Sequence, residues 1–145
     1  MNTIMINLID TTSETGHRLH ARLQQEETIW LTTVNRNGTP NPSLVWFLWE
    51  NDSVLILSQP HQGKVKAITA NPHVSLNFDS DGHGGNMLIL TGTAELLGEM
   101  SVDDVPDAYF TKYAEGLKGL GYSPEVMIAN YSKPIRITID RVRGH

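Results

Sequence analysis

The residues best placed to do chemistry lie where an apolar run ends at Ser58 and Gln59 and two lysines follow, Lys64 and Lys66. The apolar run predicts a strand, and the lysines fall in the first turns of a short predicted helix. A strand end followed by a helix N-terminus presents unpaired backbone N–H groups and the positive end of the helix dipole. We therefore predict that a phosphate-bearing ligand binds here.

A simpler interpretation of Lys64 and Lys66 is a solvated helix face, as for two lysines on any helix. The residues around them favour the site instead. Gln62 and Gly63 lie nearest the first free N–H groups, and a glycine there lets a ligand approach the backbone closely.

The elements that must position this segment are mostly strands. Helices are predicted over residues 13–25, 62–70 and 101–118, and strands over 28–34, 43–50, 54–58, 73–79, 86–97 and 134–142. Most connections between strands are short, so the sheet is predicted to be largely antiparallel. Six strands with few helices favour a small closed barrel without exposed edges. Residues 1–12 are interpreted as an N-terminal arm and residues 13–145 as one domain.

The strand over residues 43–50 is apolar on both faces. Leu44, Trp46 and Leu48 point one way, and Val45, Phe47 and Trp49 point the other. A half-exposed antiparallel strand alternates apolar with polar residues, so both faces of this strand are expected to be covered. The barrel interior covers one face, while a helix, a cofactor ring or a partner subunit covers the other. A homodimer interface is the most economical of these answers.

The composition narrows the function classes. The 145 residues carry a formal net charge of −5 without a basic stripe, so no nucleic-acid partner is expected. No apolar run reaches the ~18 residues of a membrane span, and no signal peptide is recognised, so we expect a cytoplasmic protein without a membrane partner. The absence of cysteine removes disulfides and thiolate metal sites, and the six histidines show no HExxH pattern, so no metal is expected.

Several segments together resemble the pyridoxamine 5'-phosphate oxidase-like split β-barrel superfamily, and more closely its deazaflavin (coenzyme F420)-dependent branch. In order along residues 19 to 145, these segments are WLTTV, NGTPNPSLVWF, LILSQP, NPHVSLNF, LTGTAEL and IRITIDRVRGH. The resemblance implies a mainly β (α+β) fold, a six-stranded antiparallel split β-barrel of the FMN-binding type with peripheral helices. It also implies a homodimer with cofactor sites at the subunit interface.

The family's phosphate-binding positions carry over in part. Ser58 matches the Thr or Ser that ends the third strand, and Lys64 matches the phosphate-binding lysine before the Asn-Pro pair. Gly63 stands where the FMN-using oxidases have an arginine, although Lys66 keeps a basic residue nearby. Leu88 stands where those oxidases have a glutamine. These departures put ordinary FMN oxidase activity in doubt and fit the deazaflavin branch better.

The resemblance further implies that Pro42, Ser43, Leu44 and Val45 line the isoalloxazine-type ring of the cofactor. An ordinary core strand explains Leu44 and Val45 equally well. The oxidases' arginine at the start of this strand has no counterpart here. Pyridoxamine phosphate itself is not expected as the substrate, because its phosphate-binding residues are not recognisable in the last strand.

We therefore expect an oxidoreductase that transfers a hydride between a flavin-type cofactor, with F420 favoured, and a small organic substrate. The alternatives are an FMN-dependent reductase or oxidase on the same fold, a non-catalytic flavin-, F420- or haem-binding module, and a structural dimer without ligand. No catalytic side chain or proton donor is assigned. The substrate pocket is expected from the loop 80–85 and the region 109–122.

Overall fold

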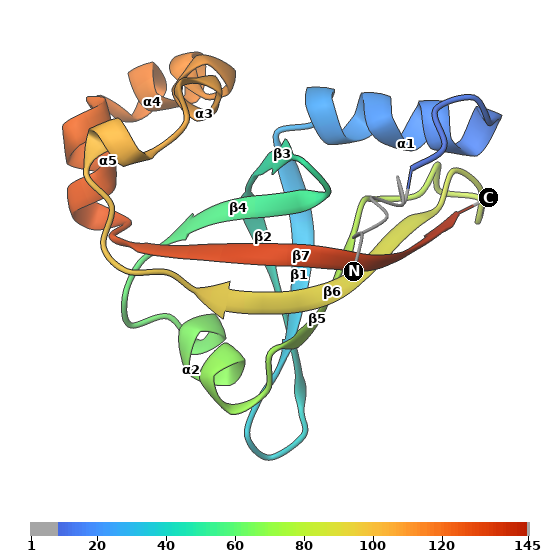
Figure 1. Cartoon of the computed structure of the whole chain (residues 1–145), viewed down its shortest axis with the longest axis horizontal. Coiled ribbons are helices and arrows are strands. Elements are labelled where there is room, and N and C mark those ends of the chain that lie inside the picture. Colours follow the sequence, from blue (N-terminus) through green and yellow to red (C-terminus); the bar gives the residue numbers. More distant parts are fainter. Residues whose placement is uncertain (1–8, 145) are drawn as a thin grey trace, which may run out of the picture.

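The computed structural model describes residues 9–144, and most of the predicted arm, residues 1–8, lies outside them. Around the sheet lie α1 (Glu14–Gln25), α2 (Gly63–Ala70), the 3-10 helix η1 (Val102–Asp104), α3 (Asp107–Lys112), α4 (Ala114–Leu120) and α5 (Pro124–Asn130). The strands are β1 (Thr28–Val34), β2 (Pro40–Trp46), β3 (Leu48–Glu50), β4 (Ser53–Ser58), β5 (His73–Asn77), β6 (Leu88–Leu96) and β7 (Lys133–Gly144). In Figure 1, α3–α5 form one group beside the sheet, with α1 and α2 at separate places on its periphery.

All strand pairs are antiparallel, and they follow the order β2-β1-β5-β6-β7-β4-β3. The two edge strands, β2 and β3, are consecutive in the chain and meet at Phe47. The sheet therefore curls until a single bent segment joins its two edges. This confirms the predicted antiparallel split β-barrel with flanking helices.

The structure has seven strands where the sequence predicts six, because the predicted strand 43–50 is interrupted at Phe47. The backbone N–H of Phe47 donates to the Tyr113 hydroxyl at 2.7 Å, and its carbonyl accepts from Lys112 Nζ at 2.9 Å. Side chains from α3 and its C-terminal end thus replace strand partners at the bend. These satisfy polar groups that would otherwise be buried unpaired.

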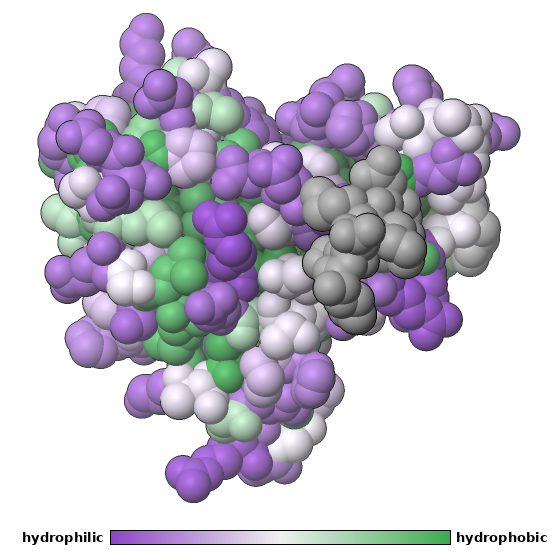
Figure 2. All heavy atoms as spheres, viewed as in Figure 1, coloured by the Kyte–Doolittle hydropathy of each residue, from purple (hydrophilic) through white to green (hydrophobic). Residues whose placement is uncertain are grey.

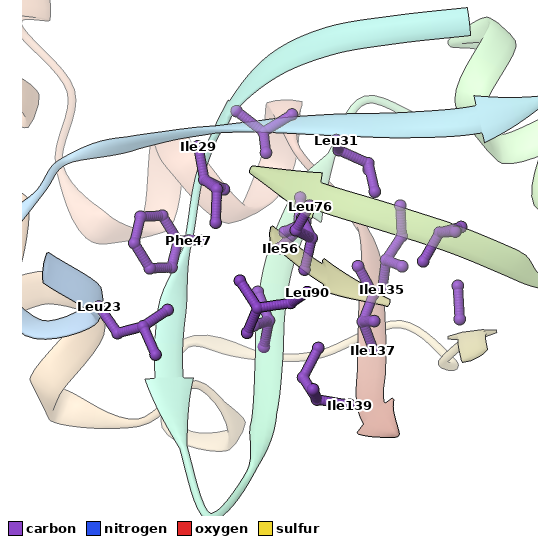
Figure 3. Close-up of a cluster of buried hydrophobic side chains, with 14 of the residues drawn as sticks. Leu23, Ile29, Leu31, Phe47, Ile56, Leu76, Leu90, Ile135, Ile137 and Ile139 are labelled. Atoms are coloured by element: carbon purple, nitrogen blue, oxygen red, sulfur yellow. The ribbon is translucent and has the colours of Figure 1, made fainter. Parts of the chain in front are cut away.

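One hydrophobic core fills the barrel. It collects the inward residues of the strands, among them Leu31, Phe47, Ile56, Leu90 and Ile137, all with no exposed surface. Figure 3 shows these side chains converging from several strands, with Leu23 of α1 closing one end. Inward positions alternate with outward ones, as expected when one sheet face is buried.

A second core lies outside the barrel, between β3–β4 and the helices α3–α5. Leu48, Leu55 and Leu57 contribute from the strands, and Tyr109, Tyr113, Leu117 and Met127 contribute from the helices. Helices therefore cover the outer face of the two-faced strand at Trp46 and Leu48, while Leu44 stays 53% exposed. Of the covers left open for that face, a helix, a cofactor ring or a partner subunit, helices are the one found over its C-terminal half.

Local differences from the predicted elements have local causes. The predicted helix 101–118 is divided into η1, α3 and α4, because Pro106 occupies the N-cap of α3 and backbone angles change again at Tyr113. The pairing of β6 with β7 shifts register between Thr91 and Gly92. A β-carbon at Gly92 would collide with the backbone carbonyl of Thr138, so only glycine allows this close approach.

Candidate functional site

A cavity of about 300 Å³ opens where the outer core meets the start of α2. Strands β2 and β4, the helix α2 and the α3–α5 group all contribute to its walls. The lining residues are Leu44, Val45, Trp46, Leu57, Ser58, Gln59, Gln62, Lys64, Tyr109, Leu120, Met127 and Tyr131. On the face shown in Figure 2, hydrophobic side chains gather between the α3–α5 group and α2. The cavity therefore combines polar residues of the predicted anion site, Ser58, Gln59, Gln62 and Lys64, with apolar walls.

The polar part of the cavity is built at the turn from β4 into α2. Ser58 is 1% exposed, and its Oγ donates to the Gln59 carbonyl at 2.9 Å. Gln62, the N-cap residue of α2, makes no capping hydrogen bond, and its Nε2 donates to Gln59 Oε1 at 2.7 Å. No acidic residue stands in the first turn. The first N–H groups of α2 are thus left for an external acceptor, which is the arrangement that binds anions.

Lys64 is the cation of this cavity. Its side chain is partly buried, and this burial lowers its pKa from the usual 10.5. The two ion pairs among the described residues, Arg22–Glu26 and Arg136–Glu50, do not include it. A lysine in the first turn also opposes the helix dipole. An anion in the cavity would offset both unfavourable terms.

The apolar wall is held rigidly from behind. The Trp46 ring stacks on Tyr113 with centroids 4.4 Å apart and planes 5° from parallel. A β-carbon at Gly116 of α4 would lie 2.9 Å from the Trp46 ring, so this helix packs directly against it. Leu44 and Leu120 stand at the rim, 53% and 56% exposed. Flat apolar surface with an open rim suits an aromatic ring system.

One tyrosine that lines the cavity has a buried hydroxyl without a partner among the described residues. Tyr109 is 0% exposed, and its Oη finds no hydrogen-bond partner among the described residues. Burial raises the pKa of Tyr109 well above its usual value, and nearby Tyr113 and Tyr131 raise it further. The phenol is therefore neutral.

The structure brings most of the predicted site residues together. Leu44, Val45, Ser58, Gln59, Gln62 and Lys64 all line the cavity. Gly63 and Lys66 instead line a wider hollow of about 950 Å³, together with residues of the turn between β1 and β2. Pro42 and Ser43 precede Leu44 on β2 and are not among the lining residues, although Ser43 Oγ is buried without a partner.

Of the two segments predicted to build a substrate pocket, one lines this cavity and the other does not. The region 109–122 contributes Tyr109 and Leu120, whereas the loop 80–85 contributes nothing to the cavity. Sequence reasoning missed Met127 and Tyr131, which belong to α5 and its end. The pair Ser123-Pro124, an N-cap followed by proline at the first helical position, is the signal that could have revealed this helix.

Two further features of residues 9–144 concern metal ions and membranes. No cluster of three or more His, Asp or Glu side chains in this range could hold a metal ion. Within the same range, the helices are all too short or too polar to cross a membrane.

The curled antiparallel sheet, closed by one bent segment and flanked by helices, defines a split β-barrel protein. The chain belongs to the pyridoxamine 5'-phosphate oxidase family, whose model matches residues 16–145. The family resemblance seen in the sequence is thereby confirmed. No curated protein matches the chain in sequence.

Solved structures share this fold at low sequence identity. An F420 reductase is 20% identical with a TM-score of 0.61, covering 86% of this chain and 94% of that one. HutZ, the haem storage protein from Vibrio cholerae, is 16% identical with a TM-score of 0.61, covering 88% and 92%. A conserved hypothetical protein from Mycobacterium tuberculosis is 17% identical with a TM-score of 0.67, covering 97% and 88%. At these identities the likeness concerns the fold alone.

Proposed function

We propose that this protein is a cytoplasmic oxidoreductase that binds a flavin-type cofactor in the cavity and transfers a hydride between it and a small organic substrate. One observation carries the proposal. The cavity joins the Lys64 ammonium, at the start of α2, to the apolar wall of Leu44, Val45 and Trp46, and this ammonium makes no ion pair within residues 9–144. A phosphate-bearing ring cofactor has the matching parts, an anion and a flat apolar body.

The residues divide the work of binding. Lys64 and the first N–H groups of α2 hold the phosphate, since a charged hydrogen bond is among the stronger ones available. Leu44, Val45 and Trp46 of β2 hold the ring and exclude water from one side of it. When bound, the cofactor supplies the hydride chemistry, and the protein supplies orientation and surroundings.

We favour F420 over FMN as the cofactor. Leu88, which stands where the oxidases have a glutamine, is buried in the barrel core and offers no polar group to a ring. Gly63, which replaces an arginine, lies outside the cavity lining. An F420 reductase of the same fold supports this choice. FMN is the alternative cofactor, and haem is the ligand suggested by the haem storage neighbour.

We also propose that the protein is a homodimer and that the second copy covers the rim of the cavity. The rim residues Leu44 and Leu120 are large, apolar and more than half exposed. Burying such side chains on association is favourable by ~25 cal/mol per Å² of apolar surface. Light scattering at micromolar concentration tests this, and a monomer would contradict it.

Spectroscopy of the purified protein tests the cofactor assignment. Titration of the protein with F420 and with FMN should quench tryptophan fluorescence, more strongly and at lower concentration for F420. A co-purified yellow flavin would favour FMN instead, and a Soret band would favour a haem-binding role. If none of the three ligands binds, the proposed function is wrong.

A further inference from the structure

The Trp46 side chain lies in a slot formed by Tyr113 and Gly116, at the start of α4. Its ring stacks on the Tyr113 ring, with centroids 4.4 Å apart and planes 5° from parallel. At Gly116 no side chain stands between the helix backbone and the far end of the indole. A β-carbon there would lie 2.9 Å from Cη2 and 3.0 Å from Cζ2 of Trp46, closer than van der Waals contact allows. The slot therefore accommodates an indole only because residue 116 is a glycine.

The backbone does not require a glycine at this position. Gly116 lies inside α4, and its φ is not in the left-handed region, whereas Gly121 ends the same helix with a φ of 71°. A glycine inside a helix is less favourable than alanine, because it costs more backbone entropy to order. Gly116 therefore needs a packing reason, and the Trp46 indole supplies one.

The Tyr113 side of the slot is fixed by hydrogen bonds. Its hydroxyl accepts from the Phe47 N–H at 2.7 Å and lies 2.6 Å from the Glu27 carbonyl and 2.8 Å from the Phe47 carbonyl. Trp46 and Phe47 are consecutive, so one tyrosine holds the indole through its ring and the next backbone unit through its hydroxyl. A side chain added at residue 116 would therefore crowd the indole.

We propose that Gly116 and Tyr113 are positioning residues, which hold the Trp46 indole at the depth where it forms a wall of the cavity. Trp46 lines the cavity, whereas neither of these two residues does, so they act through it. The inference rests on the proposed function and deepens it, because it names the residues that set the space for a flat ring beside this wall. Displacing the indole changes the ring site and leaves Lys64 in place for the phosphate.

Gly116→Ala tests this inference, and Gly119→Ala is the matched control. Both glycines lie in α4, but a β-carbon at Gly119 would meet nothing within 4 Å. Alanine is the better helix former at both positions. The dissociation constant for F420 or FMN, measured by calorimetry, should rise about tenfold in Gly116→Ala, because overpacking displaces the wall. It should stay unchanged in Gly119→Ala. The salt dependence of binding should be that of the wild type in both variants, since Lys64 is untouched.

The Trp46→Phe background shows whether the effect passes through the indole. Phenylalanine keeps a ring against Tyr113 and lacks the atoms that residue 116 would crowd. Adding Gly116→Ala to Trp46→Phe should therefore leave the dissociation constant unchanged. In proton NMR spectra of the free protein, the indole N–H signal of Trp46 is identified by its absence from Trp46→Phe. This signal should move in Gly116→Ala and stay in place in Gly119→Ala. If Gly116→Ala alone does not fold, the double variant should recover folding.

Three results would overturn the inference and leave the proposed function standing. The first is a wild type that binds a cofactor while Gly116→Ala and Gly119→Ala bind it equally well. The second is an equal loss of affinity in the Trp46→Phe background, or an unmoved indole signal, because residue 116 would then not act through Trp46. The third is a double variant that folds no better than Gly116→Ala. If the wild type binds neither F420 nor FMN, the proposed function fails and this inference fails with it.

Discussion

The most informative single change to this protein is Lys64→Ala. The Lys64 ammonium is partly buried at the start of α2 and makes no ion pair among the described residues. A hydrogen bond between charged groups contributes ~1.5–3 kcal/mol. We therefore expect the variant to bind F420 or FMN about 10- to 150-fold more weakly.

The free protein should tolerate this change. A lysine in the first turn of a helix opposes the helix dipole, at a cost of ~0.3–1 kcal/mol, and alanine is the better helix former. The melting temperature of Lys64→Ala should therefore not fall. Lys66→Ala is the matched control, because Lys66 is exposed and lines the separate hollow.

The assay is a titration followed by tryptophan fluorescence at low and high salt, and at rising pH. Wild-type affinity should weaken with ionic strength more than that of Lys64→Ala, because salt screens the ammonium–phosphate attraction. Wild-type affinity should also fall as the pH rises, because Lys64 then loses its charge. This fall should begin below pH 10.5, since burial lowers the pKa of Lys64 from that value. An unchanged dissociation constant in Lys64→Ala, or an equal loss in Lys66→Ala, would refute the assignment of the phosphate to Lys64.

Two further predictions concern the scaffold. Gly92→Ala should lower the free energy of unfolding by ~1–3 kcal/mol, because the new β-carbon meets the Thr138 carbonyl. Gly98→Ala, with open space around it, should not, and equal urea midpoints for the two variants would contradict this. Burial lowers the pKa of Lys112 to about 8, so between pH 8 and ~10.4 the unfolded state binds more protons and stability rises with pH. Lys112→Met should lose this rise, and parallel stability curves for variant and wild type would show the expectation to be wrong.

The parts of the fold that sequence predicts well are those encoded locally. The strand β1 has the predicted bounds, Thr28–Val34, because alternating β-branched and aromatic residues end at an Asn-Gly turn. The turn from β4 into α2 is also local, so Ser58 and Lys64 could be placed in one site before the structure was known. Contacts over long sequence separations could not be predicted in this way. The bend at Phe47 depends on Lys112 and Tyr113, more than 60 residues away.

The different positions of Lys64 and Lys66 could have been predicted from their spacing in the sequence. Residues two positions apart on a helix differ by about 200° around its axis. Lys64 and Lys66 therefore face different sides of α2, and the structure accordingly places them at different hollows. The packing of α3–α5 on the outer strand face could not be predicted from the sequence, for a different reason. These helices are only six or seven residues long, too short for their apolar residues to show a clear periodicity.

The central claim is that a flavin-type cofactor binds at this cavity, with its phosphate at the start of α2. The most direct test is a titration of ¹⁵N-labelled protein with F420, followed by two-dimensional amide NMR. The account predicts that the largest shifts fall on the amides of Gly63 and Lys64 and on Leu44–Trp46 of β2. Shifts confined to the turn Asn35–Gly38 and the helix around Lys66, or no shifts at saturating F420 and FMN, would contradict it.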